Sequence, residues 1–432
     1  MKQLPSIEFL YEIFKQHPKV QTDTRKLKAG DIYFALKGPN FNGNLFAANA
    51  LEAGASCAIV DEEIIIDPKW DKQVLKVEDS LLCLQALAKL HRTTFTIPFI
   101  GITGSNGKTT TKELVAAVLS SHFTTYTTEG NLNNHIGVPL TLLSIQADAQ
   151  MAVIEMGANH LKEIESYCTY AMPNFGLITN CGKAHLEGFG SEEGVKKAKG
   201  ELFDYLRANN GAAFIMSDYD YLVQMSEGIP EIINYGTKTG TVQGIAHSNN
   251  GMLAVEFTKG VDIENIQTQL VGDYNLPNVL AAVTIGIYFK VPTEKIKFAL
   301  ENYTPSNSRS QLMRWKENNI ILDAYNANPS SMKLAIENFG KLQAPHKVLF
   351  LGGMRELGKS SIDEHQQLIS IIEQFTFDKV VLVGGDFKAC KHPYLYFEDA
   401  LLAKDWLNKQ NFKGHSFLIK GSRGIQMEQL IA

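Results

Sequence analysis

The chain has 432 residues, a net charge of −5, an apolar content of 44% and a charged content of 20%. This composition is typical of a soluble globular protein with enough apolar material for the cores of two to three domains. The acidic balance argues against non-specific nucleic-acid binding, which requires a basic face.

The cysteines and the N-terminal stretch indicate the cellular compartment in which the protein works. The five cysteines are scattered and form no C-x-x-C pair, which is typical of free thiols in a reducing compartment. The N-terminal stretch carries Glu8 and Glu12 and lacks the long apolar core of a secretory signal. No apolar run approaches the roughly 18 residues of a membrane span. We therefore expect a cytoplasmic protein that does not cross a membrane.

The predicted elements begin with a small α/β domain at residues 1–80. Short apolar strands at 31–36 and 56–62 are separated by a helix-like stretch at 44–55. The second predicted domain covers 81–305. From 81 to about 215, apolar strands alternate with amphipathic helices, which predicts a parallel, doubly wound sheet. The strands are at 97–103, 151–157, 175–180 and 211–216, and the helices follow Lys108 and cover 160–168 and 192–209. The apolar stretch at 276–289 predicts a buried helix.

In the second half of the chain, the alternation of strands and helices is interrupted and then resumes. Residues 230–272 are rich in β-branched residues and turns, which favours a small antiparallel patch. Residues 304–308 read TPSNS without periodicity and indicate a linker. Beyond it the strand–helix rhythm resumes and predicts a Rossmann-like α/β domain at 306–432. Its strands are expected at 319–325, 347–353, 379–385 and 415–421.

A glycine-rich turn between a strand and a helix is the most informative motif. Residues 101–114 read GITGSNGKTTTKEL. Helix N-termini carry unpaired N–H groups and a partial positive charge, so they attract phosphate, and glycines let the backbone wrap the anion. Five residues separate Gly101 from Gly107, where the usual phosphate loop has four. We predict that phosphate binds Gly104, Ser105, Asn106, Gly107, Lys108, Thr109 and Thr110.

Four residues are candidates for binding a metal ion. Thr109 offers a hydroxyl and Glu155, at the end of a predicted strand, a carboxylate, and Mg²⁺ prefers such oxygen ligands. His185 follows another strand, where α/β sheets bind ligands, but imidazole is an unusual Mg²⁺ ligand and a structural role is the alternative. Lys199 could bind phosphate, react with CO₂ to give a metal-binding carbamate, or lie on a solvated helix face. The residues alone leave these roles open.

Together these motifs resemble the Mur ligase family, the ATP-dependent amide-forming enzymes of peptidoglycan precursor synthesis. The resemblance covers essentially the full length, in order. It rests on TDTRKLKAGDIYFALKG and FNGNLFAANALEAGA in the first predicted domain, GSNGKTTTKEL, TTEGNLNNHIGVPLTLL, EMGANHLKEIE, CGKAHLEGFGS and AKGELF in the second, and DAYNANPSSM, LGGMRELG and KGSRGIQMEQ in the third. It implies three α/β domains, with a central P-loop ATPase sheet between a UDP-sugar-binding domain and a C-terminal domain that closes on ATP.

The resemblance implies catalytic and metal-binding roles that the residues alone did not. Lys199 would be carbamylated by CO₂ and would bind Mg²⁺. His185, Glu155 and Thr109 match the other metal-ligand positions, for two Mg²⁺ ions in all. Lys108 would neutralise the charge of the transferred phosphoryl group.

The resemblance also implies that the phosphate bound by the glycine-rich loop belongs to ATP, and it implies further contacts with ATP and with the substrates. The expected ATP contacts beyond the loop are Asn275 and Asn278 at the adenine and Arg309 and Asp323 from the C-terminal domain. The expected substrate contacts are Thr24, Arg25 and Asn42 for the UDP-sugar, Asn133 and Asn134 for the tripeptide, and Tyr325, Asn326 and Asn328 for the incoming dipeptide. Asparagine also favours turns, which is the alternative role for these substrate contacts.

Within the family, DAYNANPSSM is closest to the branch that adds D-alanyl-D-alanine to UDP-N-acetylmuramoyl-tripeptide. The implied reaction passes through an acyl-phosphate, which water would hydrolyse, so we expect the site to close about a hinge at 304–308. We expect a monomer. The alternatives are another Mur-type or folylpolyglutamate-type ligase with a different amino substrate, and a non-synthetic P-loop NTPase that acts as a switch or motor.

Overall fold

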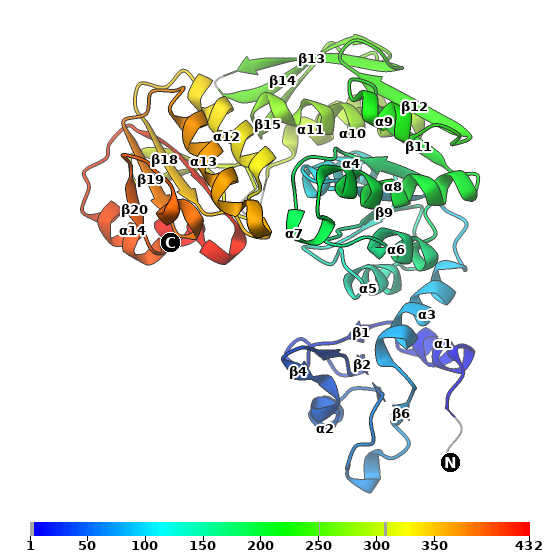
Figure 1. Ribbon diagram of the computed structural model, residues 1–432. Helices are drawn as coiled ribbons and strands as arrows, with labels where there is room; N and C mark the ends of the chain where they lie inside the picture. The colour runs from blue at the N-terminus through cyan, green and yellow to red at the C-terminus, as the bar shows by residue number, and fades with distance from the viewer. Residues whose placement is uncertain (1–3, 250, 306–308) are drawn as a thin grey trace. The chain divides into compact units, whose positions relative to one another are not determined.

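The computed structural model describes residues 4–249, 251–305 and 309–432 (Figure 1). Contacts divide the chain into two compact units. The first comprises Met1–Gly101, Phe123–Gly157 and Glu163–Phe175, and the second Ile102–His122, Ala158–Lys162 and Gly176–Ala432. Part of the predicted linker, 306–308, lies outside the described residues, so the linker and its hinge stay predictions.

The first unit contains a small parallel sheet in the order β1-β2-β5-β6. Its strands are β1 (Val20–Gln21), β2 (Ile32–Phe34), β5 (Cys57–Val60) and β6 (Val74–Lys76). All residues of β2 and β5 are buried, as expected for central strands of a parallel sheet. A short antiparallel pair, β3 (Lys37–Gly38) and β4 (Phe41–Asn42), follows β2.

The helices of the first unit pack mainly against one another, and α2 packs against this sheet. They are α1 (Ile7–Gln16), α2 (Ala47–Glu52), α3 (Ser80–Arg92), α5 (Gly137–Ser144) and α6 (Glu163–Ala171). The side chain of Asp79 accepts a hydrogen bond from the Leu82 amide and so begins α3 at a favourable N-cap. The buried Arg92 at its other end donates to the carbonyl oxygens of Phe95, Ala171 and Met172, which satisfies a charge that would otherwise be costly to bury.

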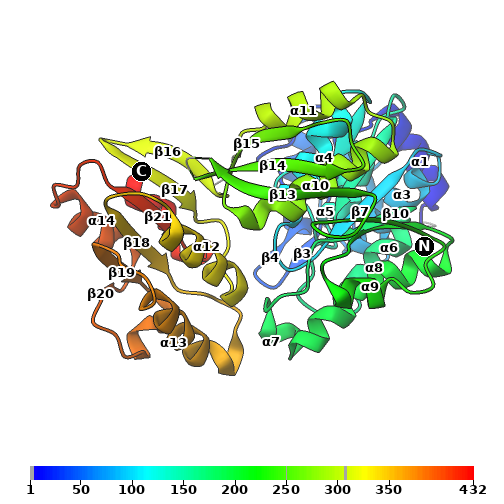
Figure 2. The same cartoon turned by 90° about the horizontal axis from the view of Figure 1, so that it is seen from above.

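The largest sheet has nine strands in the order β15-β14-β13-β12-β11-β10-β7-β9-β8. The pairs β8–β9, β11–β12 and β12–β13 are parallel, whereas β13, β14 and β15 are antiparallel and lie side by side in Figures 1 and 2. The strands are β7 (Phe99–Thr103), β8 (Thr125–Thr127), β9 (Met151–Glu155), β10 (Phe175–Ile178), β11 (Ala212–Met216), β12 (Glu231–Gly236), β13 (Val242–Asn249), β14 (Met252–Lys259) and β15 (Asn265–Val271).

The predicted antiparallel patch at 230–272 therefore exists, but it extends the large sheet and its first strand, β12, is parallel to both neighbours. The helices of the second unit that accompany these strands are α4 (Lys108–Ser120), α7 (Leu186–Phe189), α8 (Glu192–Ala208), α9 (Asp220–Met225), α10 (Leu276–Tyr288) and α11 (Thr293–Asn302). Helix α10 is buried along most of its length, as its apolar sequence predicted.

The C-terminal part of the second unit is a six-stranded sheet in the order β16-β17-β21-β18-β19-β20. Only the β16–β17 pair is antiparallel. The strands are β16 (Gln311–Trp315), β17 (Asn318–Asp323), β18 (Lys347–Gly352), β19 (Lys379–Val383), β20 (Leu395–Phe397) and β21 (Ser416–Lys420). The sequence predicted β17, β18, β19 and β21, and it missed β16 and β20, where apolar residues are few or exposed.

Two cores lie on opposite faces of this sheet because successive strand residues point to opposite sides. In β18, Leu349 and Leu351 join the core with α12 (Pro329–Lys341) and α13 (Ser361–Ile372), whereas Val348 and Phe350 join the core with α14 (Ala400–Asn408). Helices on both faces of a mainly parallel sheet give the Rossmann-like arrangement that the strand–helix rhythm predicted.

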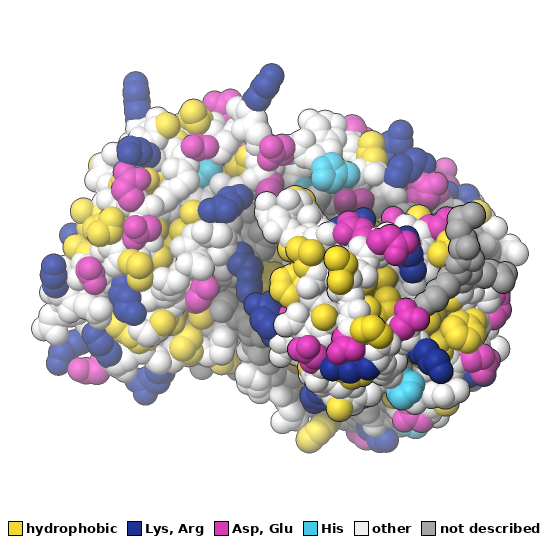
Figure 3. Space-filling model, turned by 90° about the horizontal axis from the view of Figure 1, so that it is seen from below, with side chains coloured by type: hydrophobic (Ala, Val, Ile, Leu, Met, Phe, Trp, Pro, Cys, Tyr) yellow, Lys and Arg dark blue, Asp and Glu magenta, His cyan; other side chains and the backbone are white. Residues whose placement is uncertain are grey.

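Two global expectations concern membranes and charge. Among the residues that the structure describes, no helix is long and apolar enough to cross a membrane. On the face shown in Figure 3, basic and acidic side chains are interspersed, and this face has no field of a single sign.

Candidate active site

The predicted phosphate loop lies between β7 and α4. Gly104 and Gly107 have φ angles of 143° and 79°, which favour glycine. A Cβ atom on Gly104 would lie 2.0 Å from Thr179 Oγ1, and one on Gly107 would lie 2.8 Å from Asn278 Oδ1. Both positions therefore require glycine for space as well as for backbone conformation.

Hydrogen bonds hold the loop open against the segment that follows β10. The Ser105 amide donates to the Asn180 carbonyl at 2.8 Å, and the Asn106 amide donates to the Asn180 side chain at 3.0 Å. Thr179 Oγ1 donates to the Asn106 carbonyl at 2.6 Å. A loop fixed in this way presents the N-terminus of α4, at Lys108, Thr109 and Thr110, without reorganisation when an anion binds.

Lys108 folds back over this loop. Its ammonium group donates to the carbonyl oxygens of Gly104 at 2.6 Å and Ser105 at 3.1 Å. Thr109, the next residue, is 6% exposed. The positive charge of Lys108 and the dipole of α4 therefore reinforce each other at the place where the sequence predicted phosphate.

Asn275 and Asn278, predicted to contact adenine, contact each other. Asn278 Nδ2 donates to Asn275 Oδ1 at 2.9 Å, and Thr111 Oγ1 of α4 donates to Asn278 Oδ1 at 3.0 Å. Asn275 Nδ2 donates to the Val271 carbonyl at 2.9 Å. Both side chains thus join α10 to α4 behind the phosphate loop, and their contact with adenine stays a prediction.

Glu155 ends strand β9 with its side chain 1% exposed. Asn133 Nδ2 donates to its carboxylate at 2.7 Å. A carboxylate this buried requires hydrogen bonds or positive charge, and Asn133 supplies one such bond. Asn133, predicted on the tripeptide path, therefore also orients the predicted metal ligand.

Asn134 and Asn42 serve the turns in which they lie. The Asn134 side chain accepts from the amides of Ile136 and Gly137, and Asn42 accepts from the Asn44 amide while it donates to Glu62. This is the turn role that asparagine favours. It leaves their predicted substrate contacts untested.

Arg25 and Thr24 lie in the exposed turn after β1. Both arms of the Arg25 guanidinium bind Asp23 at 2.8 Å, and this hydrogen bond lowers the pKa of Asp23 to about 2. The Thr24 carbonyl accepts from the Leu27 amide. The guanidinium is thereby oriented on the surface of the first unit, and its contact with a UDP-sugar stays a prediction.

Lys199 is the residue whose environment the sequence could not determine. It is 1% exposed in α8, and its Nζ donates to the Ala158 carbonyl at 3.1 Å and lies 5.1 Å from the centre of the Phe189 ring. On the same helix, Lys197 is exposed and Lys196 binds Glu193 at 2.6 Å. The solvated-face alternative for Lys199 is therefore wrong, although it describes Lys197.

His185 precedes the short helix α7 in a left-handed conformation, with φ of 51°. Its Nδ1 bonds to the carboxylate of Glu356, which comes from the loop after β18. The hydrogen bond with His185 lowers the pKa of Glu356. His185 therefore joins the loop after β10 to the C-terminal sheet.

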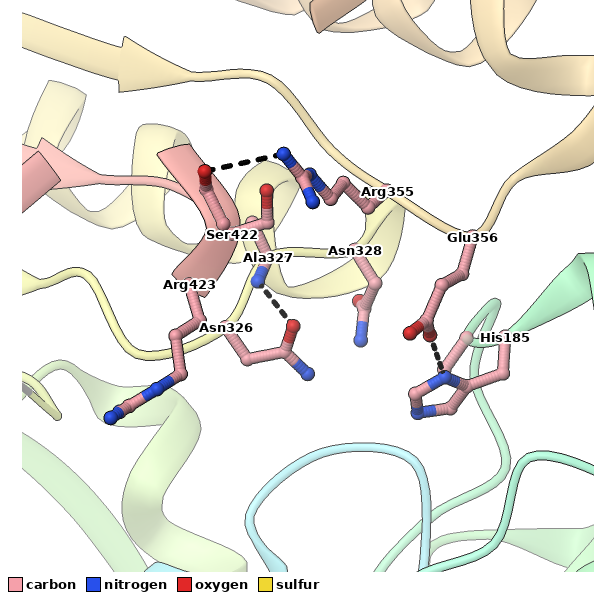
Figure 4. Close-up of a pocket in the computed structure, with 10 residues that line it drawn as sticks. His185, Asn326, Ala327, Asn328, Arg355, Glu356, Ser422 and Arg423 are labelled. Carbon is pink, nitrogen blue, oxygen red and sulfur yellow. Dashed lines mark hydrogen bonds and ion pairs between the residues drawn. The ribbon is translucent and has the colours of Figure 1, made fainter. Parts of the chain in front are cut away.

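A cavity of about 210 Å³ lies beside this pair. Its side chains come from the loops that follow β10, β17, β18 and β21 (Figure 4). Its lining residues are Ala184, His185, Asn326, Ala327, Asn328, Arg355, Glu356, Ser422, Arg423 and Gly424. Two guanidinium groups, two side-chain amides and one hydroxyl group line the cavity beside the Glu356 carboxylate. The guanidinium groups make the cavity suited to a small ligand that carries a carboxylate.

The cavity adjoins the phosphate loop through Asn328. This residue begins α12 with a capping box, and its Nδ2 donates to Asn106 Oδ1 at 2.8 Å. One residue of the predicted dipeptide site thus contacts a residue of the predicted phosphate site. A second link of the same segment is the Lys183 amide, which donates to Ser330 Oγ at 3.0 Å.

Tyr325 and Asp323 lie at the end of β17. The guanidinium groups of Arg309 and Arg423 lie 3.7 Å and 5.0 Å from the centre of the Tyr325 ring. Lys420, which is 2% exposed, donates to Asp323 at 2.6 Å and to the Asn326 carbonyl at 3.2 Å. Asp323, predicted to reach ATP, is thus paired with a buried lysine.

Sequence reasoning missed five residues of this region: Arg355, Glu356, Lys420, Ser422 and Arg423. All lie within the segments LGGMRELG and KGSRGIQMEQ, at the carboxyl ends of β18 and β21. The signal that could have found them is their position, because polar residues directly after parallel strands gather at one edge of the sheet.

Three family models match the chain: "Mur ligase family, catalytic domain" at residues 19–92, "Mur ligase middle domain" at 102–286 and "Mur ligase, glutamate ligase domain" at 308–422. A relative from Bacillus subtilis, named UDP-N-acetylmuramoyl-tripeptide--D-alanyl-D-alanine ligase, is 35% identical, with 95% of this chain and 92% of the relative covered.

Two solved structures are similar in fold over nearly the whole chain. A crystal structure of MurF from Acinetobacter baumannii has a TM-score of 0.85 and 31% identity, and covers 95% of this chain and 92% of its own. MurF ligase from Thermotoga maritima in complex with ADP has a TM-score of 0.84 and 26% identity, over 95% and 96% of the two chains. The match extends through all three predicted domains.

Proposed function

The chain belongs to the Mur ligase family, and from this premise we propose that it joins D-alanyl-D-alanine to UDP-N-acetylmuramoyl-tripeptide in an ATP-dependent, ADP-forming reaction of peptidoglycan precursor synthesis. The observation that carries the proposal is the contact of Asn328 with Asn106, because it brings a small polar cavity beside a phosphate loop. A ligase requires an activating phosphate and an amino substrate side by side.

The reaction would begin with phosphoryl transfer. The terminal carboxylate of the tripeptide attacks the γ-phosphorus of ATP in line, ADP leaves, and an acyl-phosphate forms. Such a transfer depends on positioning and on neutralising negative charge. Lys108 and the N-terminus of α4 supply fixed positive charge, and Gly104, Ser105 and Gly107 let the backbone approach the phosphates.

Amide formation would follow at the cavity. The free amine of the dipeptide attacks the acyl carbon, and the tetrahedral intermediate collapses to the amide and inorganic phosphate, with release of the amine proton. Arg355 and Arg423 suit the carboxylate of the dipeptide, since guanidinium groups bind carboxylates with two parallel hydrogen bonds. Tyr325 and Asn326 supply further surface beside these arginines.

We infer a bound metal from the chemistry of the candidate ligands. Thr109 and Glu155 are hard oxygen donors, and both are buried, as Mg²⁺ ligands in phosphoryl-transfer sites are. When bound, Mg²⁺ supplies positive charge that neutralises the phosphates. His185 is a third candidate ligand. Its Nδ1 is already oriented by Glu356, so its Nε2 is the nitrogen left to face a metal.

Carbamylation of Lys199 is the most specific part of the proposal. In this reaction a neutral amine attacks CO₂, loses a proton and becomes a carbamate with two oxygen ligands. Burial supports it, because an ammonium group at 1% exposure is costly whereas a carbamate could share its charge with a metal. The hydrogen bond from Lys199 Nζ to the Ala158 carbonyl helps to hold the side chain in place.

The remaining assignments are also proposals. Thr24, Arg25 and Asn42 would hold the UDP-sugar, Asn133 and Asn134 the tripeptide, Asn275 and Asn278 the adenine, and Arg309 and Asp323 the nucleotide from the C-terminal side. The domain boundaries would be 1–80, 81–305 and 306–432, and the enzyme would act as a cytoplasmic monomer.

The test is phosphate release from ATP with Mg²⁺ and bicarbonate, with and without each substrate. We expect release only when both substrates are present, and a product heavier by one dipeptide residue unit, that is, one dipeptide less one water. The tripeptide is supplied in two forms, ending in lysine or in diaminopimelate. A panel of other amino substrates separates this ligase from other Mur-type and folylpolyglutamate-type enzymes. ATP hydrolysis indifferent to both substrates would instead identify a switch or motor.

A further inference from the structure

Three metal-ligating side chains lie together at the edge of the C-terminal sheet opposite to the cavity. His346 directly precedes β18, Asp378 precedes β19 and His415 precedes β21. These strands are adjacent and parallel in the order β21-β18-β19, so their amino ends lie at one edge. One ligand atom from each residue lies within 4.8 Å of the others.

The backbone around this cluster is fixed by the sheet. The Ser416 amide donates to the His346 carbonyl at 2.8 Å, and the Asp378 amide donates to the Lys347 carbonyl at 2.8 Å. The Asn319 amide donates to the His415 carbonyl at 2.9 Å. Each ligand is therefore held on a strand end, which is a more rigid support than a loop.

The hydrogen bonds of His415 determine its tautomer. Its Nδ1 lies 2.9 Å from the Lys413 carbonyl oxygen. Because a carbonyl only accepts, Nδ1 carries a proton, and in the neutral ring Nε2 then carries a lone pair. This Nε2 lies 3.9 Å from Asp378 Oδ2. A backbone carbonyl on the far ring nitrogen is the usual way in which proteins orient a metal-binding histidine.

His346 approaches the same carboxylate oxygen. Its Nδ1 lies 3.0 Å from Asp378 Oδ2, and its ring stacks on that of His415 with 4.8 Å between centroids. Two imidazoles and one carboxylate oxygen thus converge on one point. A lone pair and a carboxylate that face each other repel unless a cation lies between them.

Two lysines close in sequence to the histidines of the cluster have other partners. Lys347 turns its ammonium away, to the carbonyl oxygens of Gly340 and Leu342. Lys413 pairs with Glu317 at 3.1 Å. Asp378 is 40% exposed and His346 55%, so an ion in solution can reach them.

We propose that His346, Asp378 and His415 form a binding site for a divalent transition-metal ion, which Zn²⁺ fits best. Imidazole nitrogens favour Zn²⁺, Ni²⁺ or Cu²⁺ over Mg²⁺, and three protein ligands leave a fourth tetrahedral position for water. The metal replaces the proton on His346 Nδ1, which passes to Nε2 or to water. The bound ion joins the starts of three strands and is separate from the Mg²⁺ chemistry proposed at the cavity end.

The experiment uses the full-length chain after treatment with a chelator. Zn²⁺ is titrated by calorimetry in excess Mg²⁺ and ADP, which occupy the nucleotide site. The variants are His346→Ala and Asp378→Asn, from different strands. The matched control is His247→Ala, another exposed histidine bound to a carboxylate, Glu256, at 2.7 Å. Thermal unfolding without Zn²⁺ checks that every variant folds.

We expect the wild type and His247→Ala to bind one Zn²⁺ that both cluster variants bind at least about tenfold more weakly. Co²⁺ in place of Zn²⁺ should give the visible absorption of a tetrahedral site, lost in the same two variants. Equal Zn²⁺ stoichiometry and affinity in all four proteins would overturn the proposal and leave a proton-bridged histidine–aspartate pair. Zn²⁺ binding is measured without ligase activity, so this experiment tests the metal site independently of the proposed reaction.

Discussion

The two edges of the six-stranded C-terminal sheet at which its parallel strands begin and end carry different chemical groups, although β18 and β21 contribute to both. At the carboxyl ends of β17, β18 and β21, loops line a polar cavity and contact the phosphate loop through Asn328. At the amino ends of β18, β19 and β21, two histidines and an aspartate converge. A parallel sheet gathers all ends of one kind at one edge, so residues far apart in sequence meet there. The carboxyl edge faces a second sheet's loops, whereas the amino edge faces solvent.

The largest effect is expected at the phosphate loop. Lys108→Ala removes the ammonium group that lies over Gly104 and Ser105, so charge that develops on the transferred phosphoryl group loses its partner. We expect the rate of phosphate release to fall by on the order of 10²–10³-fold. The control is Lys295→Ala, an exposed lysine of α11. An equal rate in both variants would remove Lys108 from the mechanism.

The next effect concerns Lys199 and its neighbour on α8. Lys199→Ala should lower the rate of amide formation by on the order of 10²-fold, since a buried group that orients a metal is lost. Lys197→Ala, on the exposed face, should not. Wild-type activity should fall in CO₂-free buffer and return with bicarbonate, and labelled bicarbonate should give a carbamate resonance. Activity indifferent to bicarbonate would argue for an ammonium at this position.

A smaller effect is expected at the cavity. Arg423→Ala removes one of the two guanidinium groups proposed for the dipeptide carboxylate. A charge-assisted hydrogen bond of this kind contributes about 1.5–3 kcal/mol, so KM for the dipeptide should rise about 10- to 100-fold. A dipeptide whose carboxylate is replaced by a carboxamide should already have this raised KM with the wild type. Arg423→Ala should raise the KM of that dipeptide little further. Arg314→Ala, on the exposed face of β16, is the control.

A pH effect is expected from His365, a buried histidine of α13. Burial lowers the pKa of His365, whose Nε2 accepts from the Met354 amide and whose Nδ1 donates to the Ser361 carbonyl. Asp386 and Glu364 oppose this shift. As the pH falls, the imidazole of His365 is protonated in the unfolded chain before it is protonated in the folded chain. The free energy of unfolding is therefore highest above the unfolded pKa of about 6.5 and decreases below it.

Unfolding measured by denaturant at pH 7.5 and pH 5.5 tests this sign. The wild type should lose stability on acidification, with a slope of at most about 1.4 kcal/mol per pH unit from one proton. His365→Gln should lower stability at pH 7.5 and flatten the slope. A slope that is unchanged in the variant would assign the pH dependence to other groups.

The smallest effect is expected at the amino edge. Lys413 and Glu317 form an exposed pair at 3.1 Å. Lys413→Ala should change the free energy of unfolding by less than about 0.5 kcal/mol and leave the amide-forming rate unchanged, because surface ion pairs contribute little. A large change in either quantity would show that the two edges are coupled.

The sequence by itself determined the elements and the first half of the site. Apolar runs and glycines act over a few residues, so the phosphate loop, β7, β9, β10, β18 and β21 could be predicted from local pattern. Edge strands β16 and β20 could not, since half-exposed strands carry a weak apolar signal. The same holds for the environment of Lys199, because three lysines on one helix look alike until the helix packs.

The tertiary structure decided which distant residues meet. Nothing near Asn106 in the chain indicates Asn328, and nothing near His346 indicates Asp378 or His415. These contacts follow from strand order, which depends on how the whole apolar surface is buried and not on any single segment. The cavity, the Glu356–His185 pair and the histidine cluster are consequences of that order. The sequence shows which chemical groups each residue carries. Only the packing of the folded chain determines which residues these groups contact.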